Sequence, residues 1–162
     1  YCADHAVAVG GWMLGLDLVR PEHNGCFTAI LNGGRPEVFH AHGHRDWDGR
    51  EPLRMITHHW GGHWMKGFDV YGKIDALLDD PAWRDRIAFT YIGNKPADST
   101  FHNARFLPPM DAEALAGELR AHHVYITGGI KEPAGLHQIE GALCGLPTLN
   151  RRSGRLPEYC DG

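Results

Sequence analysis

The chain has 162 residues, the length of one domain or of one domain with an appendage, so in this form it cannot be a large two-domain enzyme. Its 43% hydrophobic and 22% charged residues are ordinary for a globular protein and exclude disorder over long stretches. Sixteen Lys and Arg against twenty Asp and Glu give a net charge of −4, so the protein has no general attraction to nucleic acid or anionic lipid, and any phosphate site must be local.

Residues 1–50 contain few predicted elements. Short apolar runs predict strands at 5–9 and 26–30, and a polar stretch with Asn32, Gly33 and Gly34 follows them. These elements are too few to form a core of their own. We therefore expect residues 1–50 to be the tail of a preceding domain and a linker, and, since the first residue is Tyr1 and not Met, we expect the chain to be a fragment.

Residues 51–162 alternate short apolar runs with amphipathic segments. The predicted strands are 53–57, 87–92, 124–127 and a fourth that begins at Pro147. The predicted helices are 66–78, a segment that follows Asp111, and 135–145. This order is typical of an α/β fold, a Rossmann-like parallel sheet with helices on both faces.

The spacing of apolar residues indicates which helix faces are buried. In the first helix we expect Tyr71, Ile74, Leu77 and Leu78 to share one face that packs on the sheet. In the second helix, Asp111 is the expected N-cap. Its inner face is predicted to contain Ala112, Leu115 and Leu119.

The cysteines and the absence of a targeting signal indicate a cytoplasmic protein. The four cysteines contain no C-x-x-C pair, and reduced thiols are the expectation. The longest mostly apolar stretch, 6–19, includes Asp17 and is shorter than the roughly 18–20 residues of a membrane helix. The chain does not begin with the basic region of a secretory signal.

The segment from Glu132 to Glu140 follows the third predicted strand of the second part. Ligands of parallel α/β sheets bind beyond the carboxyl ends of strands, and helix amides from Gly135 and Leu136 onward favour a phosphate. Glu140 is placed to accept hydrogen bonds from ribose hydroxyls, and Glu132 to meet a sugar. The alternative is a solvated helix face, although Glu140 lies among apolar neighbours, where an unpaired carboxylate is costly to bury.

The segment from Thr57 to Asp69 forms the first strand-to-helix turn of this part. Gly61 and Gly62 allow a tight backbone path. Lys66 stands at the predicted helix start, where the helix dipole disfavours a cation and a bound anion would relieve the conflict. The alternative is a solvent-exposed lysine. The segment does not contain the P-loop pattern.

Several motifs in order resemble one enzyme family. They are Lys66-Gly67-Phe68-Asp69, Glu132-Pro133-x-Gly135 through Glu140-Gly141-Ala142, Cys144-Gly145-Leu146-Pro147, and Gly154-x-Leu156-Pro157-Glu158. Residues 50–162 are similar to the C-terminal, donor-binding half of GT-B glycosyltransferases, within them the retaining group 1 enzymes, or family four, with their E-x7-E motif. Residues 3–5 and 31–33 resemble that family's passage from the acceptor domain. The resemblance implies domains at 1–50 and 51–162, the second incomplete at its C-terminus.

The resemblance also implies a function. A sugar would pass from a nucleotide-diphosphate sugar to an acceptor with retention of anomeric configuration, and no cofactor or metal is expected. Lys66 would neutralise the diphosphate, Glu140 would bind the ribose, and Glu132 would contact the sugar. Backbone amides of Gly135 and Leu136 would serve the phosphate or sugar. The acceptor, a glycan, lipid or small molecule, and any peripheral membrane association belong to the missing domain.

Two features depart from the family, and a second hypothesis follows. Many relatives have an arginine shortly before the lysine, where this chain has 60–63; Lys131, Arg151 or Arg152 are the available substitutes. Most of the acceptor domain is missing, so the fragment can bind a donor without transferring it. The alternative function is therefore a non-catalytic nucleotide or nucleotide-sugar binding module, which turnover would distinguish from an enzyme.

Other patterns have simpler interpretations. The alternate histidines His40, His42 and His44 in an extended linker do not converge as zinc ligands do, so we expect no physiological metal site. The D-x-D sequence at 46–48 is interpreted as a turn. Trp60 and Trp64 are expected to bury the helix start, and stacking on a base or sugar is their alternative role.

Overall fold

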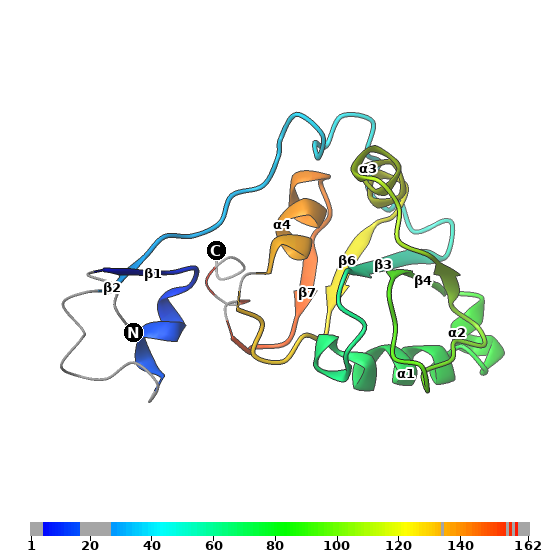
Figure 1. Cartoon of the computed structure of the whole chain (residues 1–162). Helices are drawn as coiled ribbons and strands as arrows, with labels where there is room; N and C mark the ends of the chain where they lie inside the picture. The colour runs from blue at the N-terminus through cyan, green and yellow to red at the C-terminus, as the bar shows by residue number, and fades with distance from the viewer. Residues whose placement is uncertain (1–4, 17–26, 134, 155, 157, 159–162) are drawn as a thin grey trace.

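A five-stranded parallel sheet forms the centre of the structure, a computed structural model that describes residues 5–16, 27–133, 135–154, 156 and 158. Its order is β5-β4-β3-β6-β7, and every neighbouring pair is parallel (Figure 1). The strands are β3 (Leu53–His59), β4 (Ile87–Gly93), β5 (Arg105–Leu107), β6 (Val124–Thr127) and β7 (Thr148–Asn150). The predicted strands are thus confirmed, and β5 is an addition.

Helices cover both faces of this sheet, as predicted. They are α1 (Phe68–Leu77), α2 (Pro81–Arg84), α3 (Ala112–Arg120) and α4 (Leu136–Leu143). On one face, Ile56 of β3 belongs to a core with Leu115 and Leu119 of α3, against which Leu143 of α4 packs. On the other face, Met55 belongs to a core with α1. Successive strand residues therefore point to opposite layers, as the twofold period of a strand requires.

Helix α1 buries a face that differs at one position from the prediction. Tyr71 and Leu78 are buried, but Leu77 is 39% exposed. Leu77 is six residues from Tyr71, which at about 100° per residue turns its side chain well away from that face. Asp75, and not Leu77, lies on the buried face of α1, and it is 4% exposed. Its carboxylate accepts the backbone N–H groups of His102, Asn103 and Ala104 at 2.8, 2.9 and 2.7 Å.

The expected N-cap of α3 is confirmed. Asp111 has extended backbone angles, and its Oδ1 accepts the N–H of Ala114 at 2.9 Å. The D-x-D sequence also forms the expected turn, because Asp48 Oδ1 accepts the N–H of Arg50 at 3.0 Å and Gly49 has a φ of 79°. Both side chains satisfy backbone donors locally, the role that Asp has at helix starts and turns.

The N-terminal segment forms a separate two-stranded parallel sheet of β1 (Ala6–Ala8) and β2 (Phe27–Ala29), with a 3₁₀ helix η1 (Gly11–Gly15) between them. Cys26, predicted to begin the second strand, lies outside the described residues. The linker then runs past α4 towards α3 (Figure 1). In the main core, Val38 and Phe39 are buried in one cluster with residues of α3. Near the other end of the chain, Glu158 accepts the N–H groups of Gly11 and Trp12 at 3.0 and 2.7 Å.

The expectations of reduced cysteines and of no membrane helix can be compared with the structure only over the described residues. Cys144 is buried with a free thiol, and the other three cysteines lie outside the described residues. Among the helices that the structure describes, none has the length and apolar character to cross a membrane.

Replacing Asp75 by Ala should lower the free energy of unfolding by about 2–4 kcal/mol, because three partly buried backbone N–H groups would lose a charged acceptor. Asp75→Asn keeps one acceptor oxygen and should cost less. Urea unfolding of the three proteins measures the difference.

The matched control is Asp98→Ala, because Asp98 is an exposed residue of the same type. That change should alter stability by no more than about 0.5 kcal/mol. Equal stability of the Asp75→Ala and Asp98→Ala proteins would show that the carboxylate does not hold the segment before β5.

Candidate functional site

Two loops meet at the carboxyl ends of β3 and β6, which are neighbours in the sheet. The N–H of Ile130 in the second loop donates to the carbonyl of Met65 in the first, at 2.8 Å. Gly67 has a φ of 102°, and a Cβ at this position would lie 2.5 Å from the carbonyl carbon of Gly128. Only glycine permits this approach, which places the side chains of the two loops next to one another.

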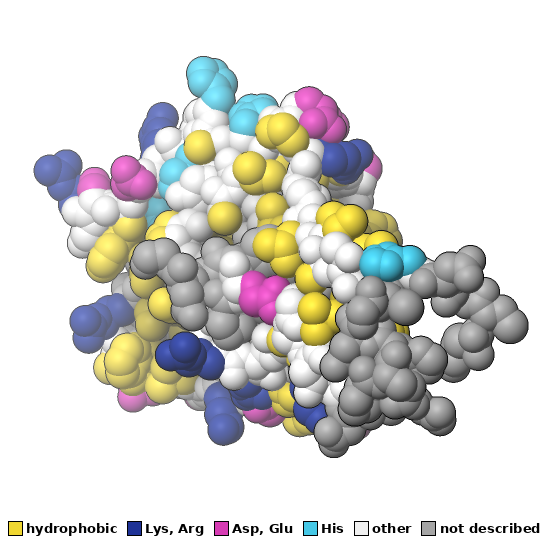
Figure 2. Space-filling model, turned by 90° about the vertical axis from the view of Figure 1, so that its left-hand side faces the viewer, with side chains coloured by type: hydrophobic (Ala, Val, Ile, Leu, Met, Phe, Trp, Pro, Cys, Tyr) yellow, Lys and Arg dark blue, Asp and Glu magenta, His cyan; other side chains and the backbone are white. Residues whose placement is uncertain are grey.

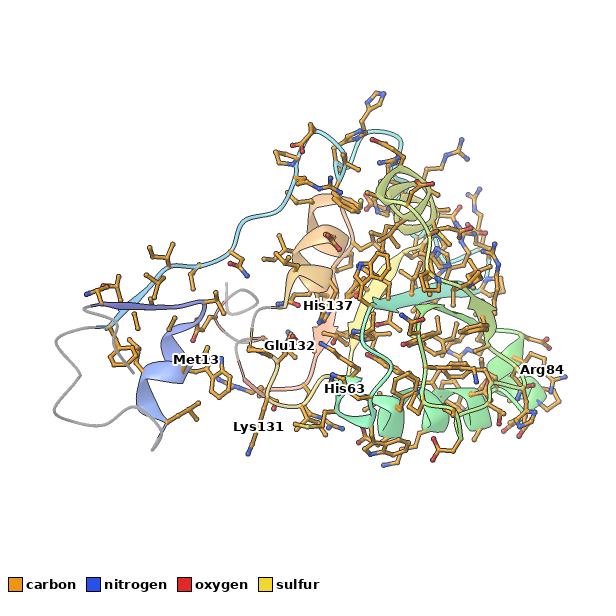
Figure 3. All side chains as sticks on the ribbon, viewed as in Figure 1. Met13, His63, Arg84, Lys131, Glu132 and His137 are labelled. Carbon is orange, nitrogen blue, oxygen red and sulfur yellow. The ribbon has the colours of Figure 1, made fainter. Side chains whose placement is uncertain are left out.

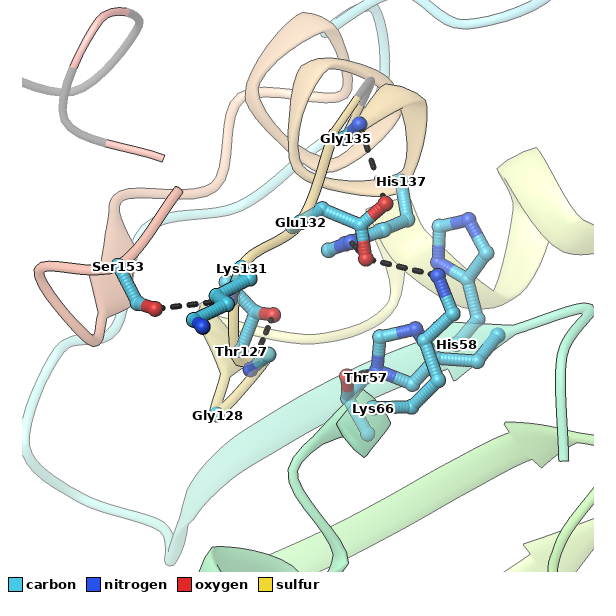
Figure 4. A network of polar contacts seen from close by, with 12 residues as sticks. Thr57, His58, Lys66, Thr127, Gly128, Lys131, Glu132, Gly135, His137 and Ser153 are labelled. Carbon is cyan, nitrogen blue, oxygen red and sulfur yellow. Dashed lines mark hydrogen bonds and ion pairs between the residues drawn. The ribbon is translucent and has the colours of Figure 1, made fainter. Parts of the chain in front are cut away.

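Lys66 and Glu132 form a buried ion pair between these loops. Lys66 Nζ lies 2.7 Å from Glu132 Oε2, and the two side chains are only 18% and 7% exposed (Figure 4). The other oxygen, Oε1, accepts the N–H of Gly135 at 3.4 Å. Lys66 ends a 3₁₀ turn, η3 (Trp64–Lys66), and α1 begins only at Phe68, because the left-handed Gly67 separates the two. The predicted helix start at Lys66 was therefore two residues early.

Glu132 is ionised at all ordinary pH values. Burial alone would raise the pKa of its carboxyl group, but the His137 ring and the Lys66 ammonium lower the pKa to about 2. His137 Nε2 lies 3.6 Å from Glu132 Oε2, beyond hydrogen-bonding distance, so the 2.7 Å contact with Lys66 is the close one. The result is a fixed negative charge beside a fixed positive charge.

A layer of histidine and tyrosine side chains joins this pair to Glu140. His58 Nε2 lies 2.7 Å from Glu140 Oε2; since a carboxylate accepts, the imidazole N–H donates. The Tyr125 hydroxyl lies 3.2 Å from Nδ1 of His58 and 3.2 Å from Nδ1 of His137. His137 then faces Glu132. A continuous series of polar contacts therefore runs from Glu140 to Lys66.

Burial favours the neutral form of the deepest histidines. Burial lowers the pKa of His59 well below its ordinary value, and the neighbouring His137, His58 and Lys66 lower it further. Burial also lowers the pKa of His137, although Glu132 acts in the opposite direction. His59 Nε2 lies 2.7 Å from the Tyr71 hydroxyl. The lysine thus remains the cation next to Glu132.

The structure brings most of the predicted site residues to one edge of the sheet. Gly135 has a φ of 49° and is the N-cap of α4, and Leu136 begins the helix with its side chain 43% exposed. A Cβ on Gly61 would contact Lys66 Cε at 3.2 Å, so this glycine lies beside the lysine stem. A Cβ on Gly62 would instead meet the backbone of Lys95 at 3.0 Å, outside the cluster.

Sequence reasoning missed the residues that connect the cluster, namely His58, Tyr125, His137 and Gln138. The available signal was the pair of histidines, His58 and His59, at the end of the apolar strand β3. In the described residues no three or more His, Cys, Asp or Glu side chains are grouped to hold a metal ion. Gln138 is 1% exposed, and neither its amide nitrogen nor its oxygen has a hydrogen-bond partner within the described structure.

Two other predictions near the site have clear outcomes. Trp60 and Trp64 are 72% and 55% exposed, so the prediction that they bury the helix start was wrong. The start of α1 is closed by the Gly128 backbone instead, which leaves the indoles outside. Of the proposed substitute cations, Arg151 is paired with Asp69 of α1, Nη2 to Oδ2 at 2.5 Å.

On the face of the molecule seen in Figure 2, the described residues show no large patch of one charge sign. On the side of the molecule with the N-terminal strands, hydrophobic side chains are spread between separate basic and acidic ones (Figure 2). The labelled Glu132 and His137 lie together between α4 and the sheet, with His63 close by (Figure 3). An anion at this site would therefore depend on local groups such as Lys66 and the start of α4.

Comparison with solved structures identifies the fold. The chain superposes on HepE (Alr3699) of Anabaena, solved with UDP and glucose, with a TM-score of 0.71 at 15% identity over 96% of this chain. It superposes on WaaG, a glycosyltransferase of lipopolysaccharide biosynthesis, with a TM-score of 0.69 at 15% identity over 96%. The fold is that of GT-B glycosyltransferases. No family model and no curated protein sequence matches the chain.

A third structure extends the comparison. The sucrose-phosphate synthase of Thermosynechococcus elongatus gives a TM-score of 0.68 at 18% identity over 94% of this chain. The chain spans 41% of that protein and 46% of both WaaG and HepE. It thus corresponds to less than half of each of these GT-B proteins.

The low pKa of Glu132 predicts a dependence of stability on pH. Because the pKa falls from 4.5 to about 2 on folding, the ionised group stabilises the fold above pH 4.5. This contribution, on the order of 2–3 kcal/mol, should disappear as the pH falls from about 4.5 to about 2. Denaturant unfolding of the natural protein and of Glu132→Gln at several pH values measures it.

The difference in unfolding free energy between the two proteins is the quantity to follow, because other carboxyl groups titrate equally in both. It should shrink as the pH falls through this window. Parallel curves for the two proteins would mean that the ion pair with Lys66 does not hold Glu132 ionised.

Proposed function

We propose that this chain binds a nucleotide-diphosphate sugar and is the donor half of a glycosyltransferase that retains anomeric configuration. The observation that carries the proposal is the single polar cluster formed by Lys66, Glu132 and Glu140 at the carboxyl edge of a GT-B sheet. Ligands of such sheets bind at this edge. The superpositions support the fold, and the cluster supplies the chemistry.

Lys66 would bind the diphosphate. An ammonium group has three N–H donors, and the contact with Glu132 uses one of them. The others can donate to phosphate oxygens that also meet the amides at the start of α4. Negative charge that develops on the departing diphosphate would then be stabilised by a cation already in place, without reorganisation.

Glu140 would bind the ribose. His58 occupies Oε2 of its carboxylate and leaves Oε1 to accept from sugar hydroxyls. The side chain is 22% exposed, so it is both oriented from behind and accessible from outside. Gln138, whose amide lies unpartnered against Gly135 in the described structure, is a second polar group that a ligand at this helix start would satisfy.

Glu132 would act on the sugar. Its carboxylate stays ionised and is held by Lys66 and the Gly135 amide. A fixed negative charge there would stabilise positive charge developing at the anomeric carbon. We propose that transfer needs no divalent metal, since Lys66 and the helix amides take the role of a cation at the diphosphate.

The other candidate function is a non-catalytic nucleotide-sugar binding module. The length of the chain does not distinguish an enzyme from a binding module, since the chain spans less than half of the GT-B proteins compared. Both functions require donor binding through the same residues. Release or transfer of the sugar from a bound donor supports the enzyme, whereas tight binding without any turnover supports the module.

Replacing Lys66 by Ala should weaken binding of a nucleoside diphosphate far more than binding of the nucleoside alone, because only the diphosphate contacts the ammonium. A thermal-shift screen of common nucleoside diphosphates selects the base, and calorimetry measures both ligands. The control is Lys73→Ala, an exposed lysine on α1. Equal losses for the two ligands would exclude a phosphate contact of Lys66.

Replacing Glu140 by Ala should weaken nucleoside and nucleoside diphosphate by the same amount, about 1–3 kcal/mol, the loss of a charge-assisted hydrogen bond to ribose. Calorimetry measures both affinities. Glu113→Ala on the exposed side of α3 serves as the control. Unchanged affinity of the Glu140→Ala protein for both ligands would exclude a contact between the ribose and Glu140.

A further inference from the structure

A cavity of about 670 Å³ lies at the amino ends of the strands, away from the candidate donor site. It is lined by Arg54 near the start of β3, by Ile87 at the start of β4 and by Arg105 at the start of β5. Arg84 of α2, which also lines it, lies across the molecule from Glu132 (Figure 3). A ligand here would not touch the cluster around Lys66.

Positive charge is concentrated around this cavity. Among the described residues, five arginines line it, whereas Glu118 is its one acidic lining residue, in a chain whose net charge is −4. Arg54 is paired with Glu51, and Arg105 with Glu118. In the described part of the chain, no ion pair joins a carboxylate to the other three arginines, Arg45, Arg84 and Arg120. An excess of positive charge therefore remains.

Two of the arginine side chains around the cavity, those of Arg84 and Arg54, are held in place by backbone carbonyls. Arg84 donates from Nε to the carbonyl of Leu78 and from Nη2 to that of Asp79, both at 2.9 Å. These acceptors are neutral, so they orient the guanidinium group without cancelling its charge. Arg54 likewise donates from Nε to the carbonyl of Ala121 at 2.8 Å. Oriented donors lose less conformational freedom on binding than free surface side chains do.

The strand register leaves room between two of these arginines. Arg54 is the register partner of Ala88, and Arg105 is the partner of Thr90, so all four side chains share the face of the sheet that α3 covers. Ala88 is exposed and fills little space. A ligand can therefore reach the sheet between the two guanidinium groups.

His122 lies at the inner side of the cavity, where burial favours its neutral form. Its Nε2 lies 2.8 Å from the Thr90 hydroxyl, and its ring is 4% exposed. Burial lowers the pKa of His122, Glu118 acts in the opposite direction, and the charges of Arg54 and Arg105 lower it further. The arginines are thus the cations that an anion would meet here.

The remaining walls are partly apolar, since Leu78, Ile87 and Phe89 also line the cavity. Guanidinium groups bind phosphate through paired N–H donors more strongly than neutral donors do. Cavities with apolar walls and a few fixed polar groups are typical binding sites for small molecules. We propose that this cavity is a second anion site, which binds the phosphate of a small phosphorylated molecule and covers its uncharged part.

Inorganic pyrophosphate is the probe for this site, followed by ¹H–¹⁵N NMR of the full 162-residue chain. The amide signals of Ala88 and Ala121 should shift and saturate. In the double variant Arg45→Ser, Arg84→Gln the affinity should fall at least about tenfold, since a glutamine amide can still donate to the carbonyls that follow α1 while the charge is gone. The matched control is Arg50→Gln, an exposed arginine outside the cavity.

The same titration separates this site from the donor site. Signals of Gly135 and Leu136 report the donor site, and Lys66→Ala should remove their shifts while those of Ala88 and Ala121 persist. If Ala88 and Ala121 do not shift in the natural protein, or if Arg50→Gln weakens their response as much as the double variant does, the second site is excluded. Either result leaves the donor-site proposal to be judged by its own signals.

The phosphate can belong to a soluble molecule or to a lipid headgroup. Co-sedimentation of the protein with lipid vesicles distinguishes these two sources. The headgroup would be assigned as the ligand if the natural protein co-sediments with phosphatidylglycerol vesicles and the double variant does not. Neither protein should co-sediment with phosphatidylcholine vesicles, which are the neutral control. Saturable pyrophosphate binding without vesicle binding would assign a soluble molecule. Absence of both would overturn the site.

Discussion

The close backbone approach of Gly67 and Gly128 is the constraint on which the candidate site depends. Parallel neighbours β3 and β6 deliver their following loops to the same edge of the sheet, but ordinary side chains would keep those loops apart. Two glycines and the bond from Ile130 to Met65 remove that separation. Lys66 and Glu132, 66 residues apart in the chain, can then form an ion pair.

The buried polar layer beneath this pair makes the arrangement rigid. A carboxylate at 7% exposure would be costly without partners, and Glu132 has a cation, an amide and a nearby imidazole. Glu140 is held by His58, which in turn meets the Tyr125 hydroxyl. Because burial lowers the pKa of His59 and His137 and so favours their neutral forms, the layer orients both glutamates without adding cations that compete with Lys66 for an anion.

Sequence patterns were sufficient for the elements and the general place of the site. Val124–Thr127 and the N-cap at Asp111 follow from local chemistry, and the structure confirms both. Strand β5 was missed because three residues with two exposed side chains show no period. The role of His58 was missed because its partner Glu140 is 82 residues away, and such a contact depends on strand order, which no local spacing encodes.

The all-parallel sheet also determines how the chain must fold. No strand pair of this sheet can close through a tight hairpin, so every pairing waits for a crossover. Met55 pairs with Val124, and 124 − 55 = 69 residues separate them. During synthesis β3 therefore pairs first with β4 and keeps its other edge open until β6 has emerged. This topology implies slow folding. Until β6 pairs with it, the open edge of β3 is exposed to aggregation and to binding by chaperones.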